Sequence, residues 1–256
     1  AAAAHVARAL AIYAEEPDAA TESQRLEPEL FDIEIAFYRD HDRFLSGGGP
    51  ERLAALAERS QARGEASCAA RAWTLLGQVA LLVADQAAAL SHVDRAVALF
   101  DALPDSPEKA DAYAELGRLR MLNYECEPAI EAAGTAADIA ARLGLAEVQA
   151  NAQITAGLAR YQAGDRAGLA ELEQAYEFCQ SHQLLAVRRA GQNLAYAVME
   201  EGDRERSNAL LAATQDRVLV SQNITPSFSE KVSDAYFLGD FDELLAAADA
   251  FAATPS

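Results

Sequence analysis

Lysine is nearly absent from this chain of 256 residues, which contains only Lys109 and Lys231. With arginine included, 21 basic residues face 40 acidic ones, so the formal net charge at pH 7 is −19. A chain with so few positive charges repels phosphate backbones and anionic membrane surfaces. The composition therefore predicts that this region binds neither nucleic acid nor membranes, and the acidic surplus keeps it soluble.

Cysteine, glycine and proline are also scarce, and no apolar run is long. The three cysteines, Cys68, Cys126 and Cys179, are odd in number and far apart, which argues against a disulfide framework and against a zinc site. The 14 glycines and 8 prolines exclude a collagen-like or low-complexity chain. The longest apolar stretch, residues 79–84, is far shorter than the roughly 18 residues that span a bilayer. We therefore expect a cytoplasmic protein with no metal and no cofactor.

The N-terminal residues are apolar, but they do not form a signal peptide. His5, Arg8 and Glu15 interrupt them at helical spacing. The chain has no initiator methionine and begins inside a predicted helix, so we expect it to be part of a longer protein.

Alanine is the residue that dominates the composition, with 60 copies. Alanine is the best helix former and is disfavoured in strands. With 51% hydrophobic residues, the chain can also bury enough surface to exclude intrinsic disorder. The composition therefore predicts an all-α protein.

An internal repeat of about 40 residues organises the chain. Gly77, Gly117 and Gly157 are followed by Ala195 at the equivalent place, with steps of 40, 40 and 38 residues. A second landmark, a turn, recurs at 84–85, 124–125, 164–165, 202–203 and 239–240. Each unit is predicted to contain a helix A, a tight turn, a helix B and a longer connector. Glycine would supply the left-handed end of helix A, and the following Asp would cap helix B.

The glycines predict where the two helices of a unit approach most closely. Trp73, Leu76, Gly77 and Ala80 recur at the spacing of one helix face, so the small residues should receive helix B. The predicted packing positions are Trp73, Gly77, Ala89, Tyr113, Gly117, Ala129 and Gly157.

We predict one domain over residues 1–256, an α-solenoid of about six helical pairs in a right-handed superhelix. Clear repeats are expected at 70–101, 110–142, 150–182 and 188–215, and a C-terminal repeat at 226–252. Weaker repeats occupy 1–63, with a helix at 1–16, a loop at 17–28, a helix at 29–45, a turn at 46–51 and a helix at 51–63. Ser106 and Pro107 should open one helix, and Gly144 should end another.

The pattern A-x-x-W-x-x-L-G, followed by A-x-x-x-V-x-x-A, at residues 70–96 resembles the tetratricopeptide repeat (TPR), whose period is usually about 34 residues. The longer period here would come from lengthened connectors. The segments 98–122 and 164–178 further resemble the repeat region of large bacterial ATPase regulators, which include LuxR-type transcriptional regulators and cyclase-linked ATPases. That resemblance implies a sensing or docking role. The family's phosphate-binding G-x-x-x-x-G-K-[ST] motif and its DNA-binding module do not occur in this sequence.

No group of residues predicts catalysis. The glycine-rich segment 46–52 lacks the Lys-Ser/Thr of a phosphate loop, and Asp40, His41 and Asp42 are expected to form a solvated helix end. Ser91, His92 and Asp94 are neighbours on one helix and point in different directions, so they cannot form a relay. We therefore predict that the protein is not an enzyme.

The remaining candidates for binding are the helix A positions that the packing does not use. In TPR superhelices these positions line a concave groove, and here they are polar, aromatic or Arg residues, although the same pattern would also suit solvated helix faces. The main candidates are Arg71, Gln78, Arg118, Asn151, Tyr161, Arg189, Asn193 and Tyr196; the same frame adds Thr74, Asp111, Glu115, Thr155, Leu158, Gln192, Glu200, Ser229, Ser233 and Tyr236.

Two functions fit these positions. The first is a sensor or scaffold region of a bacterial signalling ATPase or transcriptional regulator, which binds a protein, a peptide or a small-molecule effector. The second is a stand-alone TPR adaptor that binds peptides or partner proteins. An acidic groove would favour a basic partner.

Overall fold

The computed structural model describes residues 6, 8, 10–13, 21–222, 242 and 245. The predicted repeat 226–252, with Ser229, Ser233 and Tyr236, and most of the predicted helix 1–16 lie outside the described residues. Residues 21–222 form eleven helices and no strand. These helices are α2 (Glu22–Arg39), α3 (His41–Ser46), α4 (Gly49–Ala62), α5 (Ala66–Leu82), α6 (Gln86–Phe100), α7 (Pro107–Leu122), α8 (Cys126–Leu143), α9 (Ala146–Gln162), α10 (Ala167–Ser181), α11 (Val187–Glu200) and α12 (Arg204–Gln222).

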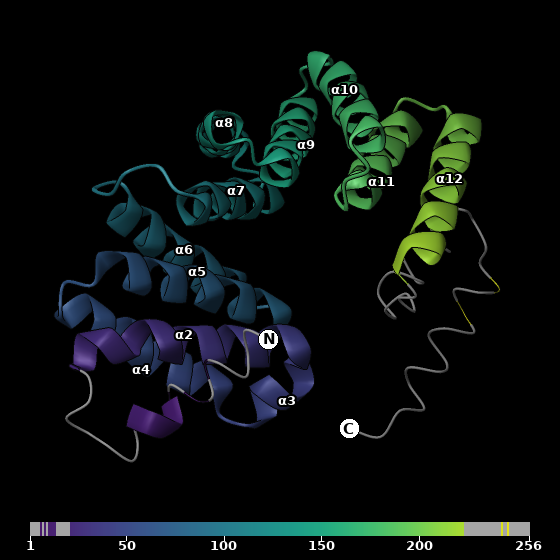
Figure 1. Ribbon diagram of the computed structural model, residues 1–256. Coiled ribbons are helices and arrows are strands. Elements are labelled where there is room, and N and C mark those ends of the chain that lie inside the picture. The colour runs from purple at the N-terminus through teal and green to yellow at the C-terminus, as the bar shows by residue number, and fades with distance from the viewer. Residues whose placement is uncertain are drawn as a thin grey trace.

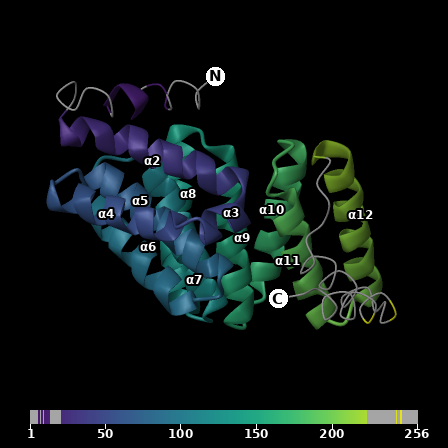
Figure 2. The same ribbon diagram turned by 90° about the horizontal axis from the view of Figure 1, so that it is seen from below.

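The helices stack one after another into a curved array. From α4 onward each helix packs mainly on its neighbours in the chain, α2 packs mainly on α4, and α5, α7, α9 and α11 also contact one another in sequence. Figure 1 shows the array arching from α2 and α4, over α7 and α9, to α11 and α12. Figure 2 shows the same order of helices from below. The chain is therefore an all-α, TPR-like solenoid, and we call α5, α7, α9 and α11 its A helices.

The repeated glycines lie where paired helices come closest. Gly117 of α7 faces α8, and a Cβ atom on it would lie 3.0 Å from the backbone nitrogen of Ala133 and 3.1 Å from the carbonyl oxygen of Ala129. Gly157 of α9 faces Leu172 of α10 at 3.2 Å in the same way. A side chain at these positions meets the facing helix at once, so a very small residue is required, which is the physical reason for the glycine repeat.

The sole tryptophan closes the seam between two units. Trp73 is buried, its ring stacks on the His92 ring with centroids 5.3 Å apart, and its indole nitrogen donates to the side-chain oxygen of Gln61 at 3.2 Å. The guanidinium carbon of Arg95 lies 3.9 Å from the centre of the indole ring. Ala89 and Ala129 are fully buried, and Tyr113 is half-buried.

The turns between paired helices use the left-handed backbone conformation. Gly164 and Gly202 have φ values of 87° and 90°, as the sequence predicted. The equivalent residues Ala84 and Tyr124 adopt the same conformation, with φ values of 60° and 58°. Asp85 caps the next helix, because its carboxylate accepts from the backbone nitrogen of Ala88 at 3.0 Å.

Most connectors are short, so the expectation of lengthened connectors is wrong for the array as a whole. The α6–α7 connector has six residues, 101–106, but α8 and α9 are joined by residues 144–145 and α4 and α5 by residues 63–65. The helices from α4 to α11 have 14 to 18 residues. The longer period therefore comes mainly from long helices, because alanine-rich sequence continues readily as helix.

Helix ends were predicted correctly at two connectors. Ser106 caps α7, with its hydroxyl accepting from the backbone nitrogen of Lys109, and Pro107 is the first helical residue. Gly144 ends α8 in the left-handed conformation, with φ of 70°.

The N-terminal part differs from the prediction in two respects. The expected loop 17–28 is helical from Glu22, because Thr21 forms a capping box with Gln24, and Pro28 lies inside α2. The expected single helix 29–45 breaks at Asp40, whose backbone is extended and whose carboxylate accepts from the backbone nitrogen of Arg43 at 2.9 Å. A cap residue thus ends α2 and starts α3.

Candidate binding groove

A polar cavity of about 400 Å³, here called the groove, lies on the A helices and α2. Five helices contribute to it, so it exists only in the stacked array. Its lining consists of Glu34 and Tyr38 from α2, Arg71, Thr74, Leu75 and Gln78 from α5, Glu108, Asp111, Ala114, Glu115 and Arg118 from α7, Glu147, Val148 and Asn151 from α9, and Arg189 from α11.

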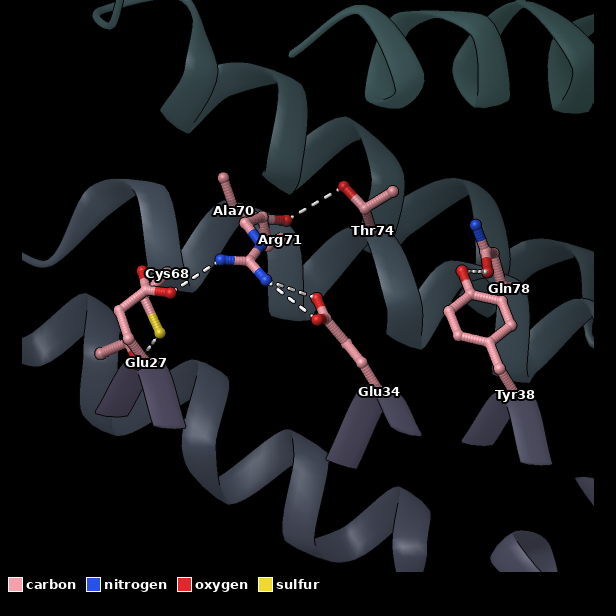
Figure 3. A network of polar contacts seen from close by, with 9 residues as sticks. Glu27, Glu34, Tyr38, Cys68, Ala70, Arg71, Thr74 and Gln78 are labelled. Atoms are coloured by element: carbon pink, nitrogen blue, oxygen red, sulfur yellow. Dashed lines mark hydrogen bonds and ion pairs between the residues drawn. The ribbon is translucent and has the colours of Figure 1, made fainter. Parts of the chain in front are cut away.

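One end of the groove is held by a clamped arginine, Arg71. Its guanidinium donates to both carboxylate oxygens of Glu34, at 2.8 and 2.9 Å, and to Glu27 at 2.7 Å. Figure 3 shows these carboxylates reaching Arg71 from α2, with the Tyr38 hydroxyl donating to the side-chain oxygen of Gln78 at 3.2 Å. These contacts join α2 to α5, and they neutralise the charge of Arg71.

The opposite end is built by Arg189 of α11, which reaches across to α9. Its guanidinium donates to the carbonyl oxygen of Asn151 at 2.9 Å, to the side-chain oxygen of Asn151 at 3.2 Å and to the Thr155 hydroxyl at 2.7 Å. Burial, together with the neighbouring Arg118, lowers the pKa of Arg189 to about 10, which still leaves it protonated at neutral pH. Glu147 accepts from the backbone nitrogens of Leu185 and Ala186 at the start of α11, at 3.0 and 2.6 Å.

The middle of the groove is acidic. Arg118 pairs with Glu115 on the same helix, whereas Asp111 makes no hydrogen bond or ion pair with any described residue. Desolvation by the surrounding protein, together with the nearby carboxylates Glu108 and Glu115, raises the pKa of Asp111 to about 6. Because five carboxylates and three guanidiniums line the groove, it has a net negative charge.

The structure brings together five of the eight main candidates from the sequence. Arg71, Gln78, Arg118, Asn151 and Arg189 line the groove, together with Thr74, Asp111 and Glu115. Tyr161, Tyr196 and Glu200 line a second, smaller cavity, and Asn193 lines neither of the two.

Two of the weaker candidates are wrong. Thr155 is fully buried and binds Arg189, and Leu158 belongs to the apolar core with 6% of its surface exposed. Helix A of this unit packs on two neighbouring A helices, which covers positions that a simple two-sided helix leaves open.

The sequence did not identify the contribution of α2. Tyr38 is exposed and faces the groove, as does Glu34. A signal existed in the repeat, because Tyr38 lies 40 residues before Gln78 and Glu34 lies 37 residues before Arg71. Glu108 and Glu147, each in the first turn of an A helix, were also missed.

Several side chains of types that can support catalysis, among them an aspartate, two histidines and two cysteines, make structural contacts instead. Asp40 caps α3, the His41 ring packs on the Phe37 ring at 4.5 Å, and the His92 ring stacks on Trp73. Burial raises the pKa of the Cys68 thiol and raises that of Cys179 to about 11, so neither is poised as a thiolate.

No group of three or more His, Cys, Asp or Glu side chains among the described residues is arranged to hold a metal ion. No helix in that part of the chain is long and apolar enough to cross a membrane.

Comparison with known proteins identifies the fold. No protein-family model matches the chain, and no curated protein matches it. Solved structures do: a Podosopora anserina kinesin-light-chain-like protein with nearly identical TPR-like repeats matches with a TM-score of 0.59 and 17% identity, over 80% of this chain and 100% of that one.

Two Rap proteins are similar at the same level. The apo form of RapI matches with a TM-score of 0.62 and 12% identity, over 86% of this chain and 83% of that one. A Rap protein complexed with Competence and Sporulation Factor matches with a TM-score of 0.62 and 14% identity, over 87% of this chain and 63% of that one. At these identities the likeness establishes the TPR-like fold.

Proposed function

We propose that this region is a non-catalytic scaffold that binds a protein or peptide segment in the groove. The observation that carries the proposal is the convergence of side chains from α2, α5, α7, α9 and α11 on one polar cavity. Because each repeat supplies only a few side chains, the lining suits an extended ligand that passes several repeats in turn.

The charge of the groove favours a basic segment. Arg71, Arg118 and Arg189 are all engaged by groups of the chain itself, whereas Asp111 has no hydrogen-bond or ion-pair partner among the described residues and lies beside Glu108. A lysine or arginine side chain placed between Asp111 and Glu108 would relieve their repulsion. The net charge of −19 would also steer a basic partner towards the protein.

Selection from a library of random octapeptides tests this function. We expect the wild-type protein to enrich peptides rich in Lys and Arg, and their release as the salt concentration rises. The double variant Glu108→Gln/Asp111→Asn should lose the enrichment. The control Glu131→Gln/Glu177→Gln removes the same charge from exposed positions on α8 and α10 and should keep it. Equal selection by all three proteins would show that the groove does not bind basic segments.

A small-molecule effector is the second candidate ligand, because a cavity of about 400 Å³ falls within the usual range of ligand pockets. Thermal-shift screening of small polar cations would detect it. Stabilisation that disappears in Glu108→Gln/Asp111→Asn would favour this alternative over a peptide.

We further propose that the region serves a larger cytoplasmic bacterial signalling protein, either an ATPase or a transcriptional regulator. The support is the resemblance of segments 98–122 and 164–178 to the repeat regions of such proteins. The alternative is a stand-alone TPR adaptor. The complete reading frame distinguishes the two: a phosphate-binding loop upstream or a helix-turn-helix downstream is expected, and an adaptor would have neither.

A further inference from the structure

A second cavity of about 300 Å³ lies where α7, α9 and α11 end. Three tyrosines line it: Tyr124 from the α7–α8 turn, Tyr161 from α9 and Tyr196 from α11. The carboxylates of Glu200 and Glu201 stand beside the rings. We call this set of five residues the tyrosine cradle.

Hydrogen bonds fix the Tyr161 ring of the cradle. The Tyr161 hydroxyl lies 3.1 Å from the carbonyl oxygen of Ala197, to which it donates, and 3.2 Å from a carboxylate oxygen of Glu201. Burial raises the pKa of both Tyr161 and Tyr196, with Glu201 acting further on the first and Glu200 on the second. Both phenols therefore remain neutral at neutral pH, and their ring faces carry the partial negative charge that attracts cations.

Tyr124 is the unusual member. It occupies the left-handed turn position at which Gly164 and Gly202 stand in later repeats, and 72% of its surface is exposed. A bulky residue is disfavoured in this conformation and gains little from burial there. Its ring thus adds to the cradle without a role in the core.

Two arginines of the chain make the kinds of contact that the cradle offers, an ion pair with a carboxylate and stacking on an aromatic ring. Arg166, whose side chain is 83% exposed, places its guanidinium 3.0 Å from Glu201 at the cradle. Elsewhere, Arg95 stacks its guanidinium on the Trp73 ring. A planar guanidinium is suited to both contacts, because it stacks on aromatic faces and donates in a fork to carboxylates.

We propose that the tyrosine cradle binds an arginine side chain of a protein partner, which takes the place of Arg166 on Glu201 and stacks on the tyrosine rings. The cradle is separate from the groove. Arg189 and Tyr196 are seven residues apart on α11, which corresponds to about 10 Å along the helix. The cradle and the groove have in common only the class of partner, a protein or peptide.

Three short peptides test the proposal on the whole chain: acetyl-Gly-Ser-Arg-Ser-Gly-amide and its analogues with lysine and with citrulline, the neutral isostere of arginine. Titrations followed through the ring resonances of labelled tyrosines should give saturable shifts of Tyr124, Tyr161 and Tyr196 with the arginine peptide, in the millimolar range. The citrulline peptide should give none. Absence of saturable shifts, or equal binding of the lysine or citrulline peptide, would overturn the assignment.

Tyr124→Gly provides a variant that does not endanger folding, since glycine suits the left-handed position better than tyrosine. It should weaken arginine binding at least five-fold. Ala84→Gly makes the same backbone change at the equivalent turn and should leave binding unchanged.

Arg166→Ala should tighten binding about two- to five-fold, because it removes a competing exposed ion pair. The groove variant Glu108→Gln/Asp111→Asn should bind the arginine peptide as the wild type does, so failure of the groove and failure of the cradle can be told apart. Retained binding in Tyr124→Gly, or weaker binding in Arg166→Ala, would refute the cradle.

Discussion

Replacing Gly117 with leucine should destabilise the central pair of helices, α7 and α8. A Cβ atom at this position would lie 3.0 Å from the backbone nitrogen of Ala133, 3.1 Å from the carbonyl oxygen of Ala129 and 3.3 Å from the Cβ of Ala133. Two of these neighbours are backbone atoms, which cannot rotate away as a flexible side chain can. The two helices must therefore separate.

The magnitude follows from two opposing effects. Replacing glycine with alanine or leucine gains up to about 1 kcal/mol of helix propensity, whereas overpacking of a tight contact typically costs about 1–3 kcal/mol. For Gly117→Ala the two effects nearly cancel. The further carbon atoms of leucine have no space between α7 and α8, so Gly117→Leu should lose about 1–3 kcal/mol.

Urea denaturation measures the loss. With an m value of about 2 kcal/mol/M, a loss of 2 kcal/mol lowers the midpoint by about 1 M. Helical circular dichroism follows the whole array, whereas the fluorescence of Trp73 reports on α5 and on its contacts with α4 and α6, next to the altered pair. Because stability in repeat proteins depends on neighbouring units, we expect both signals to move to lower urea concentrations.

Gly134 of α8 is the matched control. It is exposed, and an added Cβ would meet no atom within 4 Å. Gly134→Ala should therefore raise the free energy of unfolding by up to about 1 kcal/mol, and the urea midpoint should rise slightly. An unchanged midpoint for Gly117→Leu would refute the close approach of α7 and α8 at this residue, and with it the repeat register.

Three further predictions concern polar groups. Because the pKa of Asp111 is about 6 when folded against an ordinary 3.8, its destabilising charge develops as the pH rises from about 4 to 6. Asp111→Asn should thus add about 0.5–1 kcal/mol of stability in urea titrations at pH 7.5, after allowance for solvent screening, and nothing at pH 4; a gain at both pH values would contradict this. Arg189→Met should lower stability by about 1–3 kcal/mol in thermal unfolding, since Thr155 and Asn151 lose their donor, and an unchanged midpoint would be inconsistent with that linkage. Burial and the Asp101 carboxylate raise the pKa of Tyr113 to about 12, so Asp101→Asn should lower it towards 10 in an ultraviolet titration; a pKa unaffected by the substitution would exclude the contact.

The sequence determined the features that depend on local and periodic causes. Alanine-rich composition predicted helices, because helix propensity acts on each residue separately. The spacing of Gly77, Gly117 and Gly157 predicted the contacts of paired helices, since one steric requirement recurs in every unit. The left-handed turns at Gly164 and Gly202 and the cap at Ser106 were predictable because each depends on one residue and its neighbours in the chain.

Tertiary structure decided which polar side chains share a site. The A helices of successive units are rotated relative to one another, so equivalent positions drift between the groove, the core and the second cavity along the array. Gln78 and Arg118 line the groove, Leu158 is buried and Tyr196 lines the cradle, although these four residues occupy equivalent positions of the repeat. Glu34 and Tyr38 of α2 join the groove only through the packing of α2 on α5. A periodic sequence specifies the contacts within and between neighbouring units, but the side chains that meet across five helices depend on the accumulated curvature, which no single repeat encodes.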